Sequence, residues 1–100
     1  MTLFAWRRWW AADGLPALRL LALERWDPLN VYGDPERVDE YDAYLERVGR
    51  MLRKGAGVEE ILGYLRDVRA KALRREGGEF VDEAFANEVV AWYALEAPRG

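Results

Sequence analysis

The sequence of 100 residues contains no cysteine and no histidine, and it also lacks serine and glutamine. Without cysteine there is no disulfide framework, no thiolate zinc site and no catalytic thiol. Without histidine, the commonest metal ligand and the usual general base are missing as well. Any catalysis would depend on carboxylates, tyrosine, lysine or arginine. The sequence therefore predicts no cofactor and no metal site, and it favours a protein that is not an enzyme.

Long apolar runs are absent too. Charged residues such as Arg7, Arg19 and Glu24 interrupt every candidate well short of the roughly 20 residues that span a bilayer. In residues 1–12 the two arginines lie in the middle of the apolar side chains, whereas a signal peptide has its charges before an unbroken apolar core. We therefore expect a cytoplasmic protein with no membrane partner.

Thermolabile side chains are scarce, since the chain has only two asparagines and neither glutamine nor cysteine. Arginine outnumbers lysine by 13 to 2. This composition favours a heat-adapted bacterium as the source. A GC-rich genome is the alternative, because its codons also enrich arginine, alanine, glycine and proline.

Apolar residues make up 51% of the chain and aromatic residues 13%, which is too much for a disordered chain and enough for one domain over residues 1–100. In residues 35–54 the apolar residues recur three and four positions apart, as on one face of a helix. Asp34 is placed as its N-cap, Pro35 at its first position and Gly55 as its stop. The residues on this face are Val38, Tyr41, Tyr44, Leu45, Val48, Met51 and Leu52.

The same pattern predicts helices over residues 16–26, 58–75 and 79–96, separated by turns that contain glycine. The first of these turns is expected at Asp13 and Gly14. Trp26 is expected to anchor the end of its helix in the core. The last helix offers the core residues Val81, Phe85, Val89 and Trp92. The sequence thus predicts an all-α fold, a compact antiparallel bundle of four principal helices with a short N-terminal aromatic helix or turn.

A Trp-Asp-Pro turn at residues 26–28 is followed by Asp-Glu-Tyr-Asp at residues 39–42, a glycine break at residues 55–57 and a Tyr-Leu pair at residues 64–65. In these motifs the chain resembles a group of small, mostly uncharacterised bacterial helical proteins, over residues 20–73. The resemblance implies a short helical domain and no assigned activity. Some small proteins of this general type are immunity partners of bacterial toxins, but no binding residue carries over from them.

Charge alternates in blocks along the chain. Residues 27–46 contain seven acidic residues and one basic residue, whereas residues 47–75 contain nine basic and three acidic ones. The acidic block predicts a face that binds a basic protein, which would make the chain an immunity or regulatory partner of that protein. This face is centred on Asp39, Glu40 and Asp42, with Tyr41 or Tyr44 as an anchor. The alternative is that these charges match helix dipoles and pair within the bundle, which is the more frequent role of a charge run.

Other classes of function stay open. Asp39 and Asp42 lie three positions apart on one predicted helix face, so the chain could be a carboxylate-based enzyme or a protein that binds a small ligand or a divalent cation. Residues 39 and 40, however, point about 100° apart on a helix, which is poor geometry for one ion. A nucleic-acid partner is not expected, because acidic residues interrupt the basic block.

The N-terminal segment is rich in tryptophan, with Trp6, Trp9 and Trp10 around two arginines. The first interpretation is a flap that closes over the core of the bundle. The second is a self-association surface, because tryptophan and arginine are enriched at protein interfaces. With Trp92 this surface would form a structural homodimer.

Overall fold

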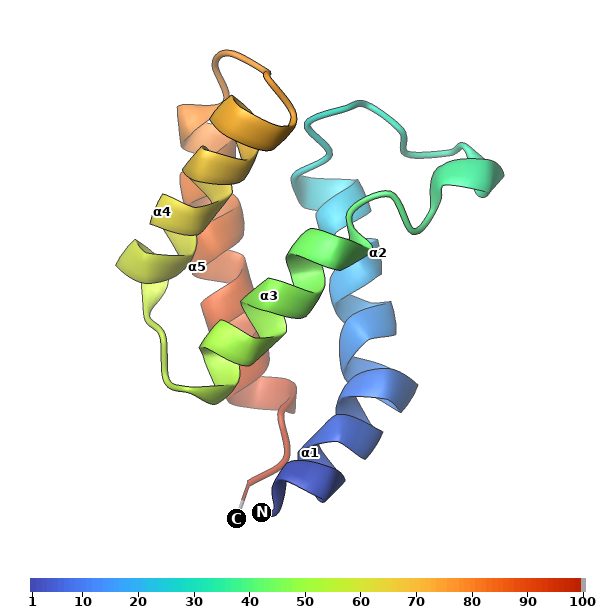
Figure 1. The fold of residues 1–100 in the computed structure, drawn as a ribbon, viewed down its shortest axis with the longest axis vertical. Helices are drawn as coiled ribbons and strands as arrows, with labels where there is room; N and C mark the ends of the chain where they lie inside the picture. Colours follow the sequence, from blue (N-terminus) through green and yellow to red (C-terminus); the bar gives the residue numbers. More distant parts are fainter. Residues whose placement is uncertain (100) are drawn as a thin grey trace.

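Figure 1 shows the computed structural model of the protein, which describes residues 1–99 as helices and connecting loops without a strand. The predicted all-α fold is confirmed. In chain order the elements are α1 (Leu3–Trp9), η1 (Trp10–Gly14), α2 (Leu15–Arg25), η2 (Pro35–Arg37), α3 (Asp42–Arg53), α4 (Val58–Asp67), η3 (Val68–Ala72) and α5 (Glu79–Glu96). None of the helices in residues 1–99 is long and apolar enough to cross a membrane.

The predicted turn at Asp13 and Gly14 is wrong, because the chain stays helical from α1 through the π-helical turn η1 into α2. Gly14 is helical there, with φ −65° and ψ −57°. It is needed for space: a Cβ atom at this position would lie 2.8 Å from Cε3 of Trp10 and 2.9 Å from the ring of Trp9. The glycine therefore lets two indole rings pack against the helix, and does not end it.

The helix predicted from Pro35 begins only at Asp42, so its predicted start is wrong. Asp34 does act as a cap, since its side chain accepts a hydrogen bond from the backbone N–H of Glu36 at 3.0 Å. The capped element is, however, the short 3-10 turn η2. The chain then turns again before α3, and this leaves Val38, which was predicted for the core, 45% exposed.

The carboxyl-terminal half of the chain follows the prediction closely. α4 continues into the π-helical turn η3, so the helix predicted over residues 58–75 ends at Ala72, and α5 spans the predicted residues 79–96. Gly77 and Gly78 have φ values of +78° and +79°, in the left-handed region that favours glycine, and they reverse the chain so that α4 and α5 pack side by side (Figure 1). Two predicted core residues of α5 differ from the prediction: Val81 lies on the surface, and Trp92 is only half-buried against the core.

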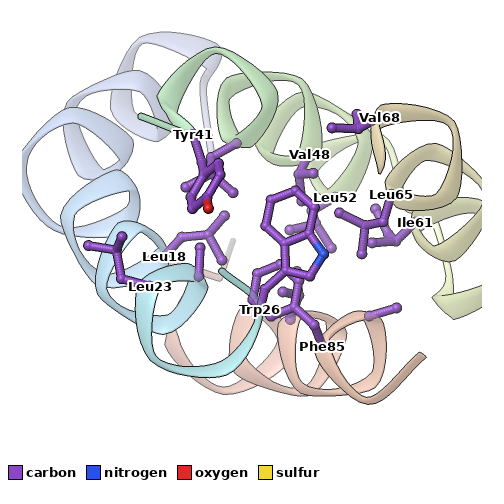
Figure 2. Close-up of a cluster of buried hydrophobic side chains, with 14 of the residues drawn as sticks. Leu18, Leu23, Trp26, Tyr41, Val48, Leu52, Ile61, Leu65, Val68 and Phe85 are labelled. Atoms are coloured by element: carbon purple, nitrogen blue, oxygen red, sulfur yellow. The ribbon is translucent and has the colours of Figure 1, made fainter. Parts of the chain in front are cut away.

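Trp26 lies at the centre of the core, as predicted for the end of its helix (Figure 2). Its indole stacks on Phe85 of α5 at 5.4 Å between ring centroids and contacts Tyr41 at 5.1 Å. Every long helical segment adds side chains to this cluster, and those with no exposed surface are Leu18, Ala22, Leu45, Val48, Ile61, Leu65, Phe85, Ala86 and Val89. Burial of these side chains is the main stabilising contribution to such a fold.

Candidate functional site

The connection between α2 and α3 projects from one end of the helices (Figure 1). We call residues 27–41 the acidic loop, because they contain five acidic residues and one basic residue. Apart from the single turn η2 the loop has no regular structure, and its conformation is held by backbone hydrogen bonds within its turns and by side-chain hydrogen bonds.

Asp27 holds the first half of the acidic loop. It has a φ of 38°, which is unusual for a residue other than glycine, and its carboxylate accepts hydrogen bonds from the backbone N–H groups of Val31 and Tyr32 at 2.8 and 2.9 Å. The Tyr41 hydroxyl donates a further hydrogen bond to the same carboxylate at 2.7 Å. Burial raises the pKa of Asp27, but these three hydrogen bonds together lower it below its ordinary value.

Tyr41 closes the acidic loop from its other end. Its ring is 2% exposed, and its hydroxyl also accepts a hydrogen bond from the backbone N–H of Leu29 at 2.8 Å. Burial, together with the hydrogen bond to the Asp27 carboxylate, raises the pKa of Tyr41 well above its ordinary value. The two ends of the loop are therefore tied together by one phenol and one carboxylate.

The outer side of the acidic loop is solvent-exposed and mixed in character. Two large apolar side chains, Tyr32 and Val38, are 60% and 45% exposed. Four carboxylates accompany them on the surface, those of Asp34, Glu36, Asp39 and Glu40. Such a surface can bind cationic and apolar groups at the same time.

The five residues predicted to bind a partner do not form one surface. Asp39 and Glu40 are exposed, and Glu40 accepts a hydrogen bond from Arg37 at 2.7 Å. Asp42 is partly exposed but already paired within the chain, because Arg19 of α2 binds its carboxylate with two hydrogen bonds of 3.0 and 2.7 Å. Tyr44 is half-buried against the core, and Tyr41 is buried. Asp39 and Glu40 are thus the predicted residues that the structure leaves facing solvent.

A groove of about 590 Å³ lies beside the acidic loop, between the end of α2 and the start of α5. Trp26 and Tyr32 line it together with the exposed Val81. Its other lining residues are Leu23, Glu24, Arg25, Asp27 and Asn30.

The N-terminal tryptophans cover the core as the flap interpretation expects. Trp6 and Trp10 are each 5% exposed and stack at 5.3 Å. The Trp6 Nε1–H donates to the hydroxyl of Tyr93 at 2.7 Å, and the Trp10 Nε1–H donates to Glu46 at 3.0 Å. Trp6 and Trp10 are therefore buried within a single chain, whereas Trp9 is half-buried. Self-association through these residues and Trp92 stays a prediction.

Sequence reasoning missed one polar cluster inside the bundle, an ion pair between Arg69 and Asp82 that also binds Trp26. A signal was present. Asp82 is three positions before Phe85, and Arg69 is four positions after Leu65, so both charged residues occupy apolar helix faces. Two opposite charges on facing apolar stripes indicate a buried pair.

The chain matches no family model, no curated protein and no solved structure. The resemblance to small bacterial helical proteins therefore stays a prediction. Within residues 1–99, no three acidic side chains lie close enough together to hold a metal ion.

Proposed function

We propose that the protein is a non-catalytic protein-interaction module that binds a basic partner protein through the acidic loop. One observation carries this proposal. The loop is tied down from inside by Tyr41 and Asp27, yet its outer side displays four carboxylates and the apolar side chains of Tyr32 and Val38. Loops held by a rigid scaffold are frequent binding sites.

The internal hydrogen bonds favour binding because a loop that is already ordered loses little conformational entropy when a partner arrives. The excess of acidic residues attracts a basic surface and accelerates the encounter with it. Both effects act without any change in the helices.

Tyr32 takes the role of anchor in this proposal, in place of the buried Tyr41. Tyrosine is enriched among residues that dominate binding energy, because it offers a large apolar ring and a polar hydroxyl. The groove next to Tyr32 has room for an apolar side chain of the partner. An immunity or regulatory role toward a basic protein would use this surface directly.

The test is capture from a native lysate by the immobilised protein at low and high salt. The disrupting variant is Asp39→Lys/Glu40→Lys, because neither side chain contacts the core. The matched control is Asp67→Lys/Glu83→Lys, which makes the same change of charge at exposed positions of α4 and α5. Circular dichroism serves as the control that both variants are folded.

We expect one basic protein to be captured by the wild type and by the control variant, to be lost with Asp39→Lys/Glu40→Lys, and to be weakened by salt. Tyr32→Ala is expected to weaken capture without changing its salt dependence. Equal capture by both charge variants, or capture of no basic protein at all, would contradict the proposal.

A further inference from the structure

A second pocket is lined by the continuous helix that runs from α1 through η1 into α2 and by the carboxyl-terminal part of α5. Its volume is about 460 Å³. Its aromatic lining consists of Trp9 and Trp92, whose rings are stacked with centroids 6.0 Å apart and planes 29° apart. The remaining lining residues are Asp13, Ala17 and Glu96.

The aromatic pair is held from behind. The Trp9 ring meets the ring of Tyr93 edge-on at 6.0 Å between centroids, and Tyr93 in turn accepts the hydrogen bond from Trp6. Both Trp9 and Trp92 are only half-buried, so part of each indole stays accessible from the pocket. The aromatic wall is therefore positioned before any ligand arrives.

The charge of this pocket has one sign. Asp13 and Glu96 are its only charged lining residues, and both are exposed. Among residues 1–99 neither carboxylate takes part in a salt bridge. Two carboxylates beside two partly exposed indole rings attract a cation, because carboxylates are negative and the face of an aromatic ring is the negative end of its quadrupole.

Arginine side chains of this protein stack on several of its aromatic rings. Guanidinium groups lie over other rings: Arg53 over Trp6 at 5.2 Å, Arg47 over Tyr64 at 5.8 Å and Arg8 over Phe4 at 5.9 Å. No such contact is made to Trp9 or Trp92 within the described part of the chain. What sets Trp9 and Trp92 apart is that they line one pocket together with two carboxylates.

We propose that the pocket lined by Trp9, Trp92, Asp13 and Glu96 binds a guanidinium group of a ligand. A guanidinium is planar and weakly hydrated, so it stacks on indole while its N–H groups donate to carboxylates. A smaller and more strongly hydrated ammonium fits this combination less well. This site shares no residue with the acidic loop, so it does not depend on the proposed function.

The test uses arginine amide as the probe and citrulline amide, its neutral urea analogue, as the control ligand. Binding is followed by the NMR signals of the indole N–H groups, which Trp9→Phe and Trp92→Phe assign. We expect arginine amide to shift the signals of Trp9 and Trp92 in a saturable way and citrulline amide to leave them in place. A short peptide with one internal arginine, compared with arginine amide, distinguishes a side chain of a partner protein from a free small molecule.

The variant Asp13→Asn/Glu96→Gln keeps the shape of the pocket and removes both charges. It is expected to weaken the affinity for arginine amide about tenfold or more, because hydrogen bonds to charged groups are strong. The control Asp67→Asn/Glu83→Gln removes the same charge elsewhere and is expected to leave the affinity unchanged. Equal shifts with citrulline amide, shifts that do not saturate, or equal weakening by both variants would overturn the proposal.

Discussion

Arg69 and Asp82 form an ion pair inside the bundle, with Nη2 of Arg69 2.7 Å from Oδ1 of Asp82. The Asp82 carboxylate is 1% exposed and accepts further hydrogen bonds from Nε of Arg69 at 2.9 Å and from Nε1 of Trp26 at 2.8 Å. The pair joins η3 to α5, and the hydrogen bond from Trp26 connects the end of α2 to the same carboxylate. Gly78 allows this arrangement, because a Cβ there would lie 2.4 Å from Cζ of Arg69.

Asp82→Asn is expected to lower the free energy of unfolding by about 3–5 kcal/mol, because it leaves the charge of Arg69 buried without a counter-charge. Urea unfolding followed by circular dichroism measures this loss. Glu83→Gln, at the exposed neighbouring position, is the control and should stay within about 0.5 kcal/mol of the wild type. The double variant Arg69→Met/Asp82→Leu should lose less of the free energy of unfolding than Asp82→Asn, because it leaves no unpaired charge in the core. A single variant as stable as the wild type would show that the pair is not required.

Gly49→Ala is expected to destabilise the protein by about 1–3 kcal/mol. The added Cβ would lie 2.5 Å from Cη2 of Trp10, and this ring cannot move freely because it stacks on Trp6 and donates to Glu46. Gly63→Ala in α4 is the matched control, since nothing lies within 4 Å of its added Cβ. It should stabilise the protein by about 0.5–1 kcal/mol. Thermal unfolding of the two variants should therefore shift in opposite directions, and shifts in the same direction would refute this packing.

Tyr41 should make the protein sensitive to alkali. Its pKa is raised by burial above the ordinary value of 10.0, so folding favours the neutral phenol. The resulting stability is complete below pH 10 and is lost as the pH rises toward the pKa of the folded state. Tyr41→Phe should therefore show a smaller loss of stability above pH 10 than the wild type, as measured by urea unfolding at several pH values. Burial also raises the pKa of Tyr64, which accounts for a residual alkaline loss.

The control for Tyr41→Phe is Tyr32→Phe, because Tyr32 is exposed on the acidic loop. This variant should keep the alkaline dependence of the wild type. Below pH 10, Tyr41→Phe should still be less stable than the wild type, since it removes the hydrogen bonds to Asp27 and from Leu29. An alkaline profile identical to that of the wild type would exclude Tyr41 as its source.

Asp27 should make the stability of the protein depend on pH in the acid range. Hydrogen bonds lower its pKa in the folded state below the ordinary value of 3.8 despite its partial burial, so folding favours the carboxylate. This contribution is present above pH 3.8 and is lost as the pH falls through the lowered pKa. Asp27→Asn should therefore lose less stability on acidification than the wild type. Glu36→Gln, an exposed change on the same loop, should retain the wild-type profile, and a steeper acid loss in Asp27→Asn would contradict the argument.

The predicted partner-binding residues show which positions a local sequence pattern can place on the surface and which it cannot. Asp39 and Glu40 are exposed as a charge run suggests, but Asp42 carries the same charge two positions later and is bound by Arg19 from another helix. Tyr41 lies between them and points into the core. Helical periodicity could not separate these residues, because the turn that precedes α3 changes the face on which each of them lies.

What the sequence determined by itself is local. The helical spacing of apolar residues and the glycine pair at residues 77–78 act within a few residues, and they predicted the all-α fold and the bounds of α5. The capping side chain of Asp34 is equally local, but it caps only the short turn η2. Features that depend on contacts between distant segments of the chain could be established only from the tertiary structure. One such feature is the continuous helix through Gly14, where the indole rings of Trp9 and Trp10 pack against the glycine. The tertiary structure also joins Tyr41 to Asp27 and Arg69 to Asp82, since these side chains meet only after the helices have packed and excluded water.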